Sequence, residues 1–143
     1  MAEELTLTVA SSEDADAAEA LRLAVLDYNL RATGLAAAVP IVHLLRDHGG
    51  IVNGGVAAYV WGSWVQVEWI WVSEPHRNRR WGSLLLEAAE ASAQAAGAQH
   101  AYVQTFSFQA RPFYERHGYR VVGELRGFPP GESYFLMQKD FGQ

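Results

Sequence analysis

The chain of 143 residues contains no cysteine. A disulfide framework, a thiolate metal site and a cysteine nucleophile are therefore excluded. The five histidines are scattered without the spacing of a metal-binding motif, and isolated histidines are more often surface or capping residues than ligands. We therefore expect no metal.

Positive charge and long apolar runs are also scarce. Eleven Lys and Arg against sixteen Asp and Glu give a formal net charge of -5, whereas nucleic-acid binding depends on clustered cations. No apolar stretch approaches the roughly 20 residues needed to span a bilayer, and the first five residues carry two glutamates where a secretory signal needs a basic start. We expect a cytoplasmic protein without nucleic-acid or membrane partners, and the acidic balance fits a cationic small substrate.

Half of the residues are apolar, enough for one core but not for two ordinary domains, so a single domain over residues 1–143 is expected. Alternation of Leu5, Leu7 and Val9 predicts a strand, and a helix follows from Ser12 until Gly34. Further patterns predict strands over 40–45, 51–60, 64–72, 99–105, 119–125 and 134–139, and helices over 81–96 and 110–117. This order predicts an α/β mixed sheet with helices on both faces.

Residues 64–72, WVQVEWIWV, are apolar at nearly every position. Such a strand is expected in the middle of the sheet, buried on both faces. Earlier in the chain, Gly54-Gly55 interrupts its strand and is a candidate β-bulge.

Three arginines lie in the loop 72–83, VSEPHRNRRWGS, which joins this central strand to a long helix. The first N–H groups of a helix lack intrahelical partners and carry the positive end of its dipole, so a loop leading into them can bind an anion such as pyrophosphate. Gly82 would allow a close backbone approach. The alternative is a solvated turn with exposed arginines. The loop lacks the Gly-Lys-Ser/Thr ending of a Walker motif, which argues against an NTPase. It also lacks the three spaced glycines of a dinucleotide-binding motif, which argues against a Rossmann dehydrogenase.

This loop resembles the signature of the GNAT superfamily of N-acetyltransferases, a strand followed by Arg/Gln-x-x-Gly-x-Gly/Ala and a helix. Arg77 and Gly82 match, and Arg80 stands in place of the first glycine. Residues 107–119, SFQARPFYERHGY, resemble the family's second motif, Asn-x-x-Ala-x-x-x-Tyr before Gly-Phe or Gly-Tyr, with Ser107 in place of asparagine. Residues 67–139 are similar to a bacterial subgroup of small GNAT proteins whose substrates are mostly unassigned.

The resemblance implies a single-domain, mixed but mostly antiparallel, twisted sheet of about seven strands with helices on both faces. It implies direct transfer of an acetyl group from acetyl-CoA to a primary amine of a small molecule or peptide in a ternary complex, without metal. The alternative is a catalytically silent acyl-CoA-binding or regulatory module of the same fold, for which Arg80 and Ser107 are the best arguments. A protein-interaction domain without a CoA site is a further alternative. A homodimer is compatible with the resemblance to this family and with the five tryptophans.

The resemblance also assigns the cofactor site. The pantetheine arm would pair with the backbone of the central strand, and an N–H of Trp71 or Val72 would contact the thioester carbonyl. The residues implied in cofactor binding are Ile70, Trp71, Val72, Arg77, Asn78, Arg79, Arg80, Trp81, Gly82, Ser83 and Ser107.

Two residues are candidates for catalysis. Tyr114 lies at the family's general-acid position, or else packs its helix against the sheet. Glu68 is the single carboxylate of the central strand; it is a candidate base or a counter-ion for a cationic substrate, or else a solvent-facing or ion-paired residue. Tyr28 and Asn29 lie where GNAT folds enclose the acceptor, or are ordinary residues of an amphipathic helix.

The sequence also suggests roles for the tryptophans and for His117. Tryptophans such as Trp69 and Trp71 either pack in the core or line an acceptor pocket or a dimer face. His117, directly before Gly118, is expected to help end its helix.

Overall fold

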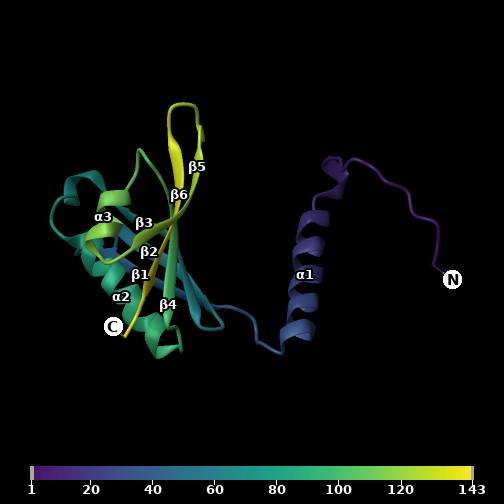
Figure 1. Ribbon diagram of the computed structural model, residues 1–143, viewed down its shortest axis with the longest axis horizontal. Helices are drawn as coiled ribbons and strands as arrows, with labels where there is room; N and C mark the ends of the chain where they lie inside the picture. The colour runs from purple at the N-terminus through teal and green to yellow at the C-terminus, as the bar shows by residue number, and fades with distance from the viewer. Residues whose placement is uncertain (1, 143) are drawn as a thin grey trace. The chain divides into compact units, whose positions relative to one another are not determined.

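The computed structural model describes residues 2–142, and its contacts divide the chain into two units that meet between Ala37 and Ala38. The first unit contains a 3-10 helix, Ser12–Asp14, and the helix α1, Ala17–Thr33 (Figure 1). As predicted, Gly34 ends α1 in a left-handed conformation, with φ 69°. The single domain over residues 1–143 stays a prediction.

The predicted strand over Leu5, Leu7 and Val9 is wrong. Residues 2–11 contain no strand, and these three side chains are 91%, 100% and 95% exposed. Their alternation satisfies the sequence pattern, but no neighbouring strand supplies the hydrogen bonds that a strand requires.

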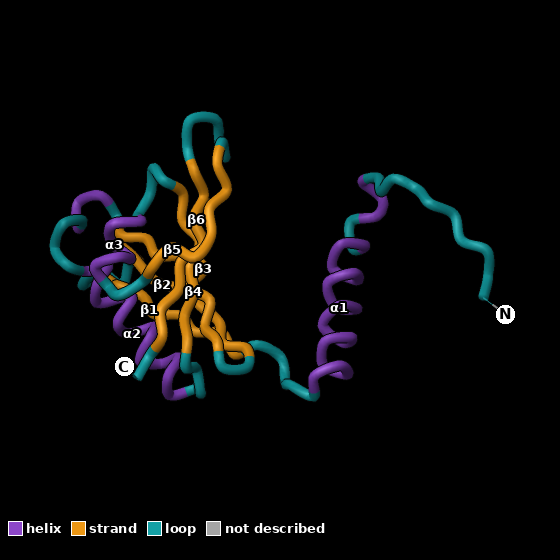
Figure 2. Tube along the Cα trace, in the orientation of Figure 1, coloured by secondary structure: helices purple, strands orange, loops and turns teal. Residues whose placement is uncertain are grey.

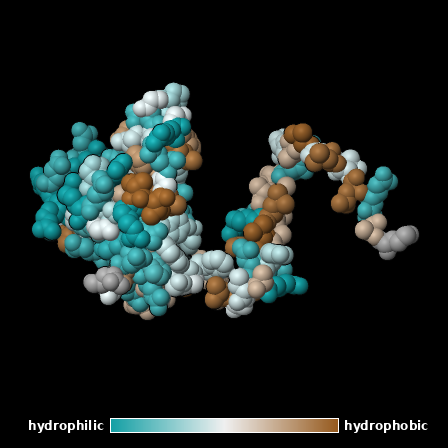
Figure 3. All heavy atoms as spheres, viewed as in Figure 1, coloured by the Kyte–Doolittle hydropathy of each residue, from teal (hydrophilic) through white to brown (hydrophobic). Residues whose placement is uncertain are grey.

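Local interactions hold the helices of the first unit. A capping box links Ser11 and Asp14, and Arg22 forms an ion pair with Glu19 at 2.6 Å. No residue of either helix is buried, and Figure 3 shows apolar side chains along α1.

The second unit is a six-stranded sheet (Figure 2) in the order β1-β2-β3-β4-β6-β5. The single parallel pair is β3–β4, and the other four are antiparallel. The mixed, mostly antiparallel α/β sheet is therefore confirmed, with six strands instead of about seven. The strands are β1 Val39–Arg46, β2 Val52–Trp61, β3 Trp64–Val72, β4 His100–Phe106, β5 Arg120–Arg126 and β6 Ser133–Asp140.

Two helices, α2 (Trp81–Ala95) and α3 (Arg111–Arg116), cover one face of this sheet. Leu86 of α2 is fully buried against core residues of β2 and β3, and the guanidinium of Arg111 lies 4.6 Å from the ring of buried Phe135 in β6. Within this unit, β3 is not buried on both faces as predicted, because Trp69 and Trp71 point to the other face and are 72% and 53% exposed. Within residues 38–142, no helix covers that second, open face.

The centre of the sheet is irregular at Glu68. Ala57 of β2 pairs with Trp69 and Ala58 pairs with Val67, so Glu68 is an extra residue in β3. The parallel pairing with β4 also ends here, since Val67–Val103 is its last pair. β3 therefore continues beyond the bulge with β2 on one side and no paired strand on the other.

A second bulge lies beside Gly54, where the register between β1 and β2 shifts. A Cβ atom at Gly54 would lie 2.8 Å from the carbonyl oxygen of Trp71 and 3.0 Å from Cδ1 of Leu45. Glycine is therefore required at this position by the close approach of β3, and the predicted irregularity at Gly54-Gly55 is confirmed.

We predict that Gly54→Ala lowers the free energy of unfolding by about 1–3 kcal/mol, because the added methyl group meets backbone that cannot move aside. Gly123→Ala is the matched control in β5, since its Cβ would lie 3.7 Å from Leu136. Its effect should stay within about 0.5 kcal/mol. Urea denaturation measures both, and equal destabilisation would contradict the steric argument.

Candidate functional site

The free edge of β3 presents backbone groups of alternate residues. The N–H of Ser73 donates to the carbonyl of Asn53 at 2.8 Å, so Trp71 also directs its backbone toward β2. Ile70 and Val72 then direct theirs away from β2. The carbonyl of Val72 already accepts a hydrogen bond from Nε of Arg77 at 2.9 Å. The N–H groups of Ile70 and Val72 remain as donors along this edge.

The loop after β3 has an unusual backbone. Asn78 and Arg80, with φ 62° and 67°, are the two non-glycine residues with positive φ in the part of the chain that the structure describes. Asparagine tolerates this conformation, but arginine does so at a cost of about 1–2 kcal/mol. Arg80 therefore keeps the backbone conformation that favours glycine, and its side chain is exposed to solvent.

The loop leads into the open N-terminus of α2. No side chain caps this end and its first turn has no acidic residue. The first amide with a backbone partner is that of Leu84, which donates to the carbonyl of Arg80 at 3.1 Å. The amides of Trp81, Gly82 and Ser83 are therefore available at the positive end of the helix dipole, where anions bind. Arg77 and Arg79 are exposed beside them.

Helix α3 is fixed against this turn of α2. Ser83 Oγ and His117 Nε2 are 2.9 Å apart, and the ring of His117 lies 4.8 Å from that of Phe113. A Cβ atom at Gly82 would lie 3.4 Å from the Phe113 ring, which is ordinary contact, so the packing at this position does not itself require glycine. His117 caps the end of α3, as predicted. Its bond to Ser83 was not predicted, because the two residues lie 34 positions apart.

Tyr114 of α3 is 7% exposed, yet its hydroxyl forms no hydrogen bond with another of residues 2–142. Among the described residues, no fully buried side-chain oxygen or nitrogen lacks a hydrogen-bond partner. The unpaired Tyr114 hydroxyl is therefore not fully buried and retains some access to solvent. Burial raises the pKa of Tyr114 to about 12. The hydroxyl is therefore protonated near neutral pH and can donate a hydrogen bond.

A buried polar network supports the ring of Tyr114. Tyr119 packs edge-on against it at 5.6 Å and donates from its hydroxyl to Glu90 at 2.7 Å. Lys139 donates to the same carboxylate at 2.9 Å. Burial, and then the negative charge of Glu90, raise the pKa of Tyr119. The sequence analysis missed this network, whose one local signal is a glutamate on the apolar face of a helix.

Glu68 lies in the bulge of β3 and is exposed, without an ion pair in the described part of the chain. Nearby, the hydroxyls of Tyr59 and Tyr102 both donate to Gln66, the latter at 2.7 Å. Burial raises the pKa of Tyr102 to about 12, followed by the neighbouring Tyr59 and, least, the charge of Glu68. The bulge thus places a carboxylate where the strands separate.

Ser107, Tyr28 and Asn29 complete the set of predicted site residues. The Ser107 hydroxyl contacts the Glu132 carboxylate and accepts from the N–H of Ser133 at 2.9 Å, so it joins the end of β4 to the β5–β6 loop. Tyr28 and Asn29 lie in α1, in the first unit. Their role in acceptor binding stays a prediction.

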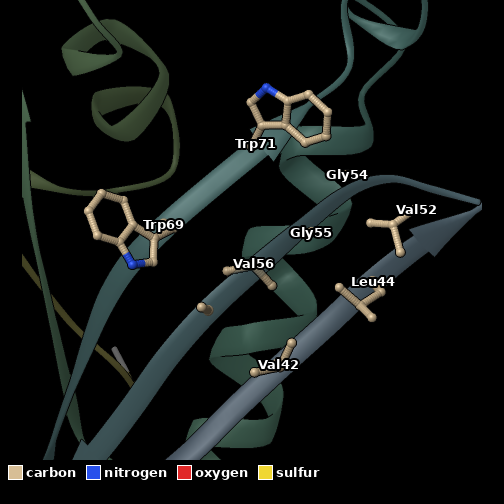
Figure 4. Close-up of a pocket in the computed structure, with 9 residues that line it drawn as sticks. Val42, Leu44, Val52, Gly54, Gly55, Val56, Trp69 and Trp71 are labelled. Carbon is tan, nitrogen blue, oxygen red and sulfur yellow. The ribbon is translucent and has the colours of Figure 1, made fainter.

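A shallow apolar pocket lies on the open face (Figure 4). Val42 and Leu44 of β1 line one side, and Trp69 and Trp71 of β3 line the other, with α2 behind the strands. Trp69 and Trp71 therefore contribute to a surface and not to the core.

The comparisons with known proteins agree with this architecture. Residues 40–121 match the family model described as an acetyltransferase (GNAT) domain. The chain is 30% identical over 128 residues to the acetyltransferase Atu2258 of Agrobacterium fabrum, covering 90% of this chain and 93% of that protein. The chain belongs to the GNAT acetyltransferase family. This acetyltransferase is also 36% identical over 92 residues to blasticidin-S acetyltransferase of Streptomyces morookaense, covering 64% and 68% of the two chains.

Solved structures show the same fold. A crystal structure of an acetyltransferase from Bacillus cereus matches this acetyltransferase with a TM-score of 0.82 and 25% identity, over 95% of this chain and 97% of the other. An aminoglycoside 6'-N-acetyltransferase complexed with coenzyme A matches with a TM-score of 0.64 and 17% identity, over 73% and 74%.

Residues 2–142 were also compared with the requirements of a membrane-spanning helix and of a metal site. No helix there is long and apolar enough to cross a membrane. The same residues contain no group of three or more His, Cys, Asp or Glu side chains suited to hold a metal ion.

We predict that Arg80→Gly raises the free energy of unfolding by about 0.5–1 kcal/mol, because glycine adopts the positive φ without strain. Arg79→Gly removes the same charge from a residue without positive φ and should lower stability by about 0.5–1 kcal/mol. Chemical denaturation of both variants measures the difference. Equal changes would show that charge, and not backbone strain, dominates at Arg80.

Proposed function

We propose that this acetyltransferase binds acetyl-CoA along the free edge of β3 and transfers the acetyl group directly to a primary amine in a ternary complex. One observation carries the proposal. The pairing of β3 with β4 ends at Val67, β3 continues to Val72 as a free edge, and the following loop leads to the unpartnered amides of α2. A strand-like amide chain ending in phosphates matches both parts in that order.

In this arrangement the pantetheine arm takes the position of a missing strand. The N–H groups of Ile70 and Val72 donate to its carbonyls, because the backbone of Trp71 faces β2. One of these two groups polarises the thioester carbonyl as negative charge develops on its oxygen. The amides of Trp81, Gly82 and Ser83 receive the pyrophosphate, and Arg77 and Arg79 add positive charge. The coenzyme A held by the aminoglycoside acetyltransferase of the same fold supports this cofactor.

The transfer requires a neutral amine. Its nitrogen attacks the thioester carbonyl carbon, a C–N bond forms, and the C–S bond then breaks. The amine gives its proton to Glu68, directly or through water, and the thiolate leaves with a hydrogen bond from Tyr114. Glu68 suits this task because the bulge directs it outward without an ion pair.

The raised pKa of Tyr114 limits its role. A free thiol titrates near 8.5, so complete proton transfer from a tyrosine with a pKa of about 12 would be uphill by roughly 5 kcal/mol. Tyr114 therefore stabilises the developing thiolate by donating a hydrogen bond, and the thiolate gains its proton as it returns to solvent.

Tyr114→Phe should lower kcat about a hundredfold, because the leaving thiolate loses its donor, while the KM for acetyl-CoA stays unchanged. The assay is thiol release from acetyl-CoA with a panel of primary amines. The thermal unfolding midpoint is the control: it should not fall, since the hydroxyl has no partner within residues 2–142 to lose. Unchanged kcat would remove Tyr114 from the mechanism.

Acetyl-CoA should raise the unfolding midpoint of the wild-type protein, because a ligand that binds only the folded state stabilises it. A shift without thiol release in the presence of any amine would identify the catalytically silent acyl-CoA-binding module instead. No shift at saturating acetyl-CoA would overturn the cofactor site as well.

The pH profile tests the raised pKa of Tyr114. The Tyr114 hydroxyl donates a hydrogen bond only while it is protonated, so its contribution is lost as pH rises through its pKa of about 12. Between about pH 6 and pH 10, kcat/KM should rise with the neutral fraction of the amine and show no falling limb from this residue. A falling limb near pH 9 that disappears in Tyr114→Phe would contradict the assignment.

A further inference from the structure

Four aromatic rings gather where β4 ends and the β5–β6 loop returns to the sheet. Phe106 lies 5.2 Å from Phe108, 5.3 Å from Phe128 and 4.5 Å from Tyr134, measured between ring centroids. We call these residues the aromatic cluster. Phe108 is 59% exposed and Phe128 is 48% exposed. Exposed, grouped aromatic rings are typical of a binding surface, and the proposed mechanism leaves them unused.

The aromatic cluster lies on the open face of the sheet. In β4, Val103 and Thr105 are buried, so Phe106 points to the other face. In β6, Phe135 is buried, and Tyr134 points to that same open face, directly opposite Phe106 in the pairing.

Along the strands, the aromatic cluster lies a short way beyond Glu68, where we propose that the amine reacts. Val103 is the last residue of β4 to pair with β3, and Phe106 follows it three residues later. Glu68 follows Val67, the partner of Val103, so Phe106 is two positions further along. At about 3.3 Å per residue, the offset along the strands is roughly 7 Å.

Negative charge accompanies the rings. Glu132 lies in the β5–β6 loop, where its carbonyl accepts from the N–H of Phe128 at 3.3 Å. In the part of the chain described, Glu132 has no ion pair with a cation, whereas Glu124 is paired with Arg126 at 3.4 Å. The Glu132 carboxylate contacts only the Ser107 hydroxyl in the described hydrogen bonds. The Glu132 carboxylate and the ring of Phe128 thus belong to one loop, and aromatic faces and a carboxylate without a paired cation both attract a positive charge.

We propose that the aromatic cluster and Glu132 bind a second positive charge of the acceptor, at the end of the molecule remote from the reacting amine. The inference rests on the proposed function, because it assumes that the amine reacts beside Glu68. The substrate class is then an amine with an additional cationic group, separated from the reacting nitrogen by a chain or ring that bridges the offset between Glu68 and Phe106.

Two matched acceptors test the inference. The compounds 1,6-diaminohexane and n-hexylamine share one chain and differ in the second cation. The wild-type protein should use the diamine with kcat/KM about threefold to thirtyfold higher, the range expected for a cation over aromatic rings. The advantage should appear mainly in KM, since the remote charge takes no part in the transition state.

Phe108→Leu and Glu132→Gln should each reduce this preference toward one, without changing kcat for n-hexylamine or the KM for acetyl-CoA. Phe108→Leu keeps an apolar side chain and removes the ring. Val122→Ala is the control: Val122 is an exposed residue of β5 outside the aromatic cluster, and the variant should keep the wild-type preference.

The outcomes separate the two proposals. Turnover of both amines without preference, or a preference that survives in both variants, overturns the inference and leaves the proposed function standing. If no amine is turned over, the proposed function fails, and titration calorimetry with 1,6-diaminohexane decides the inference. Binding that Phe108→Leu weakens supports it, and no binding at millimolar diamine overturns it.

Discussion

A ladder of four residue pairs holds together the two halves of the sheet in this acetyltransferase. One half consists of β1, β2 and β3, the other of β4, β6 and β5, and each is antiparallel. Between them, only Trp64–Val67 and His100–Val103 pair, in parallel. Parallel strands need a crossover connection, and here it is α2. The end of this ladder is therefore the start of the free edge of β3. The crossover through α2, which makes the parallel pairing possible, also brings the N-terminus of α2 to the far end of that free edge.

The site uses backbone geometry more than side chains. Glu68 projects from the strand because β3 has one residue too many for β2. The amides of α2 are open because neither a capping side chain nor an acidic residue occupies them. Arg80 and Ser107 were the best sequence arguments for a silent module. The φ of 67° at Arg80 shows that the loop keeps the conformation of a glycine there, so Arg80 no longer argues for an altered loop backbone.

Much of the fold follows from local patterns. The strands 51–60 and 64–72 and the helix 81–96 were predictable, because alternation and helical spacing act over a few residues. The strand predicted over Leu5, Leu7 and Val9 had the same alternation but does not form. A strand also needs a neighbouring strand to pair with, and alternation within one segment does not show whether there is one. In the site, motif register identified Tyr114 and the loop of Arg77–Gly82, whose roles remain proposals. Long-range contacts, such as Ser83 with His117 and Phe106 with Tyr134, could not be read from spacing.

The positive φ of Arg80 also bears on how such loops are recognised. A pattern written in letters marks this position as a mismatch, because it demands glycine. Written as torsion angles, the same position matches, and the replacement has a definite energetic cost instead of a prohibition. Sequences with asparagine, aspartate or even arginine at the equivalent place can then be ranked by torsional cost. Searches that treat the glycine as obligatory will overlook members of the family whose loops have the same shape.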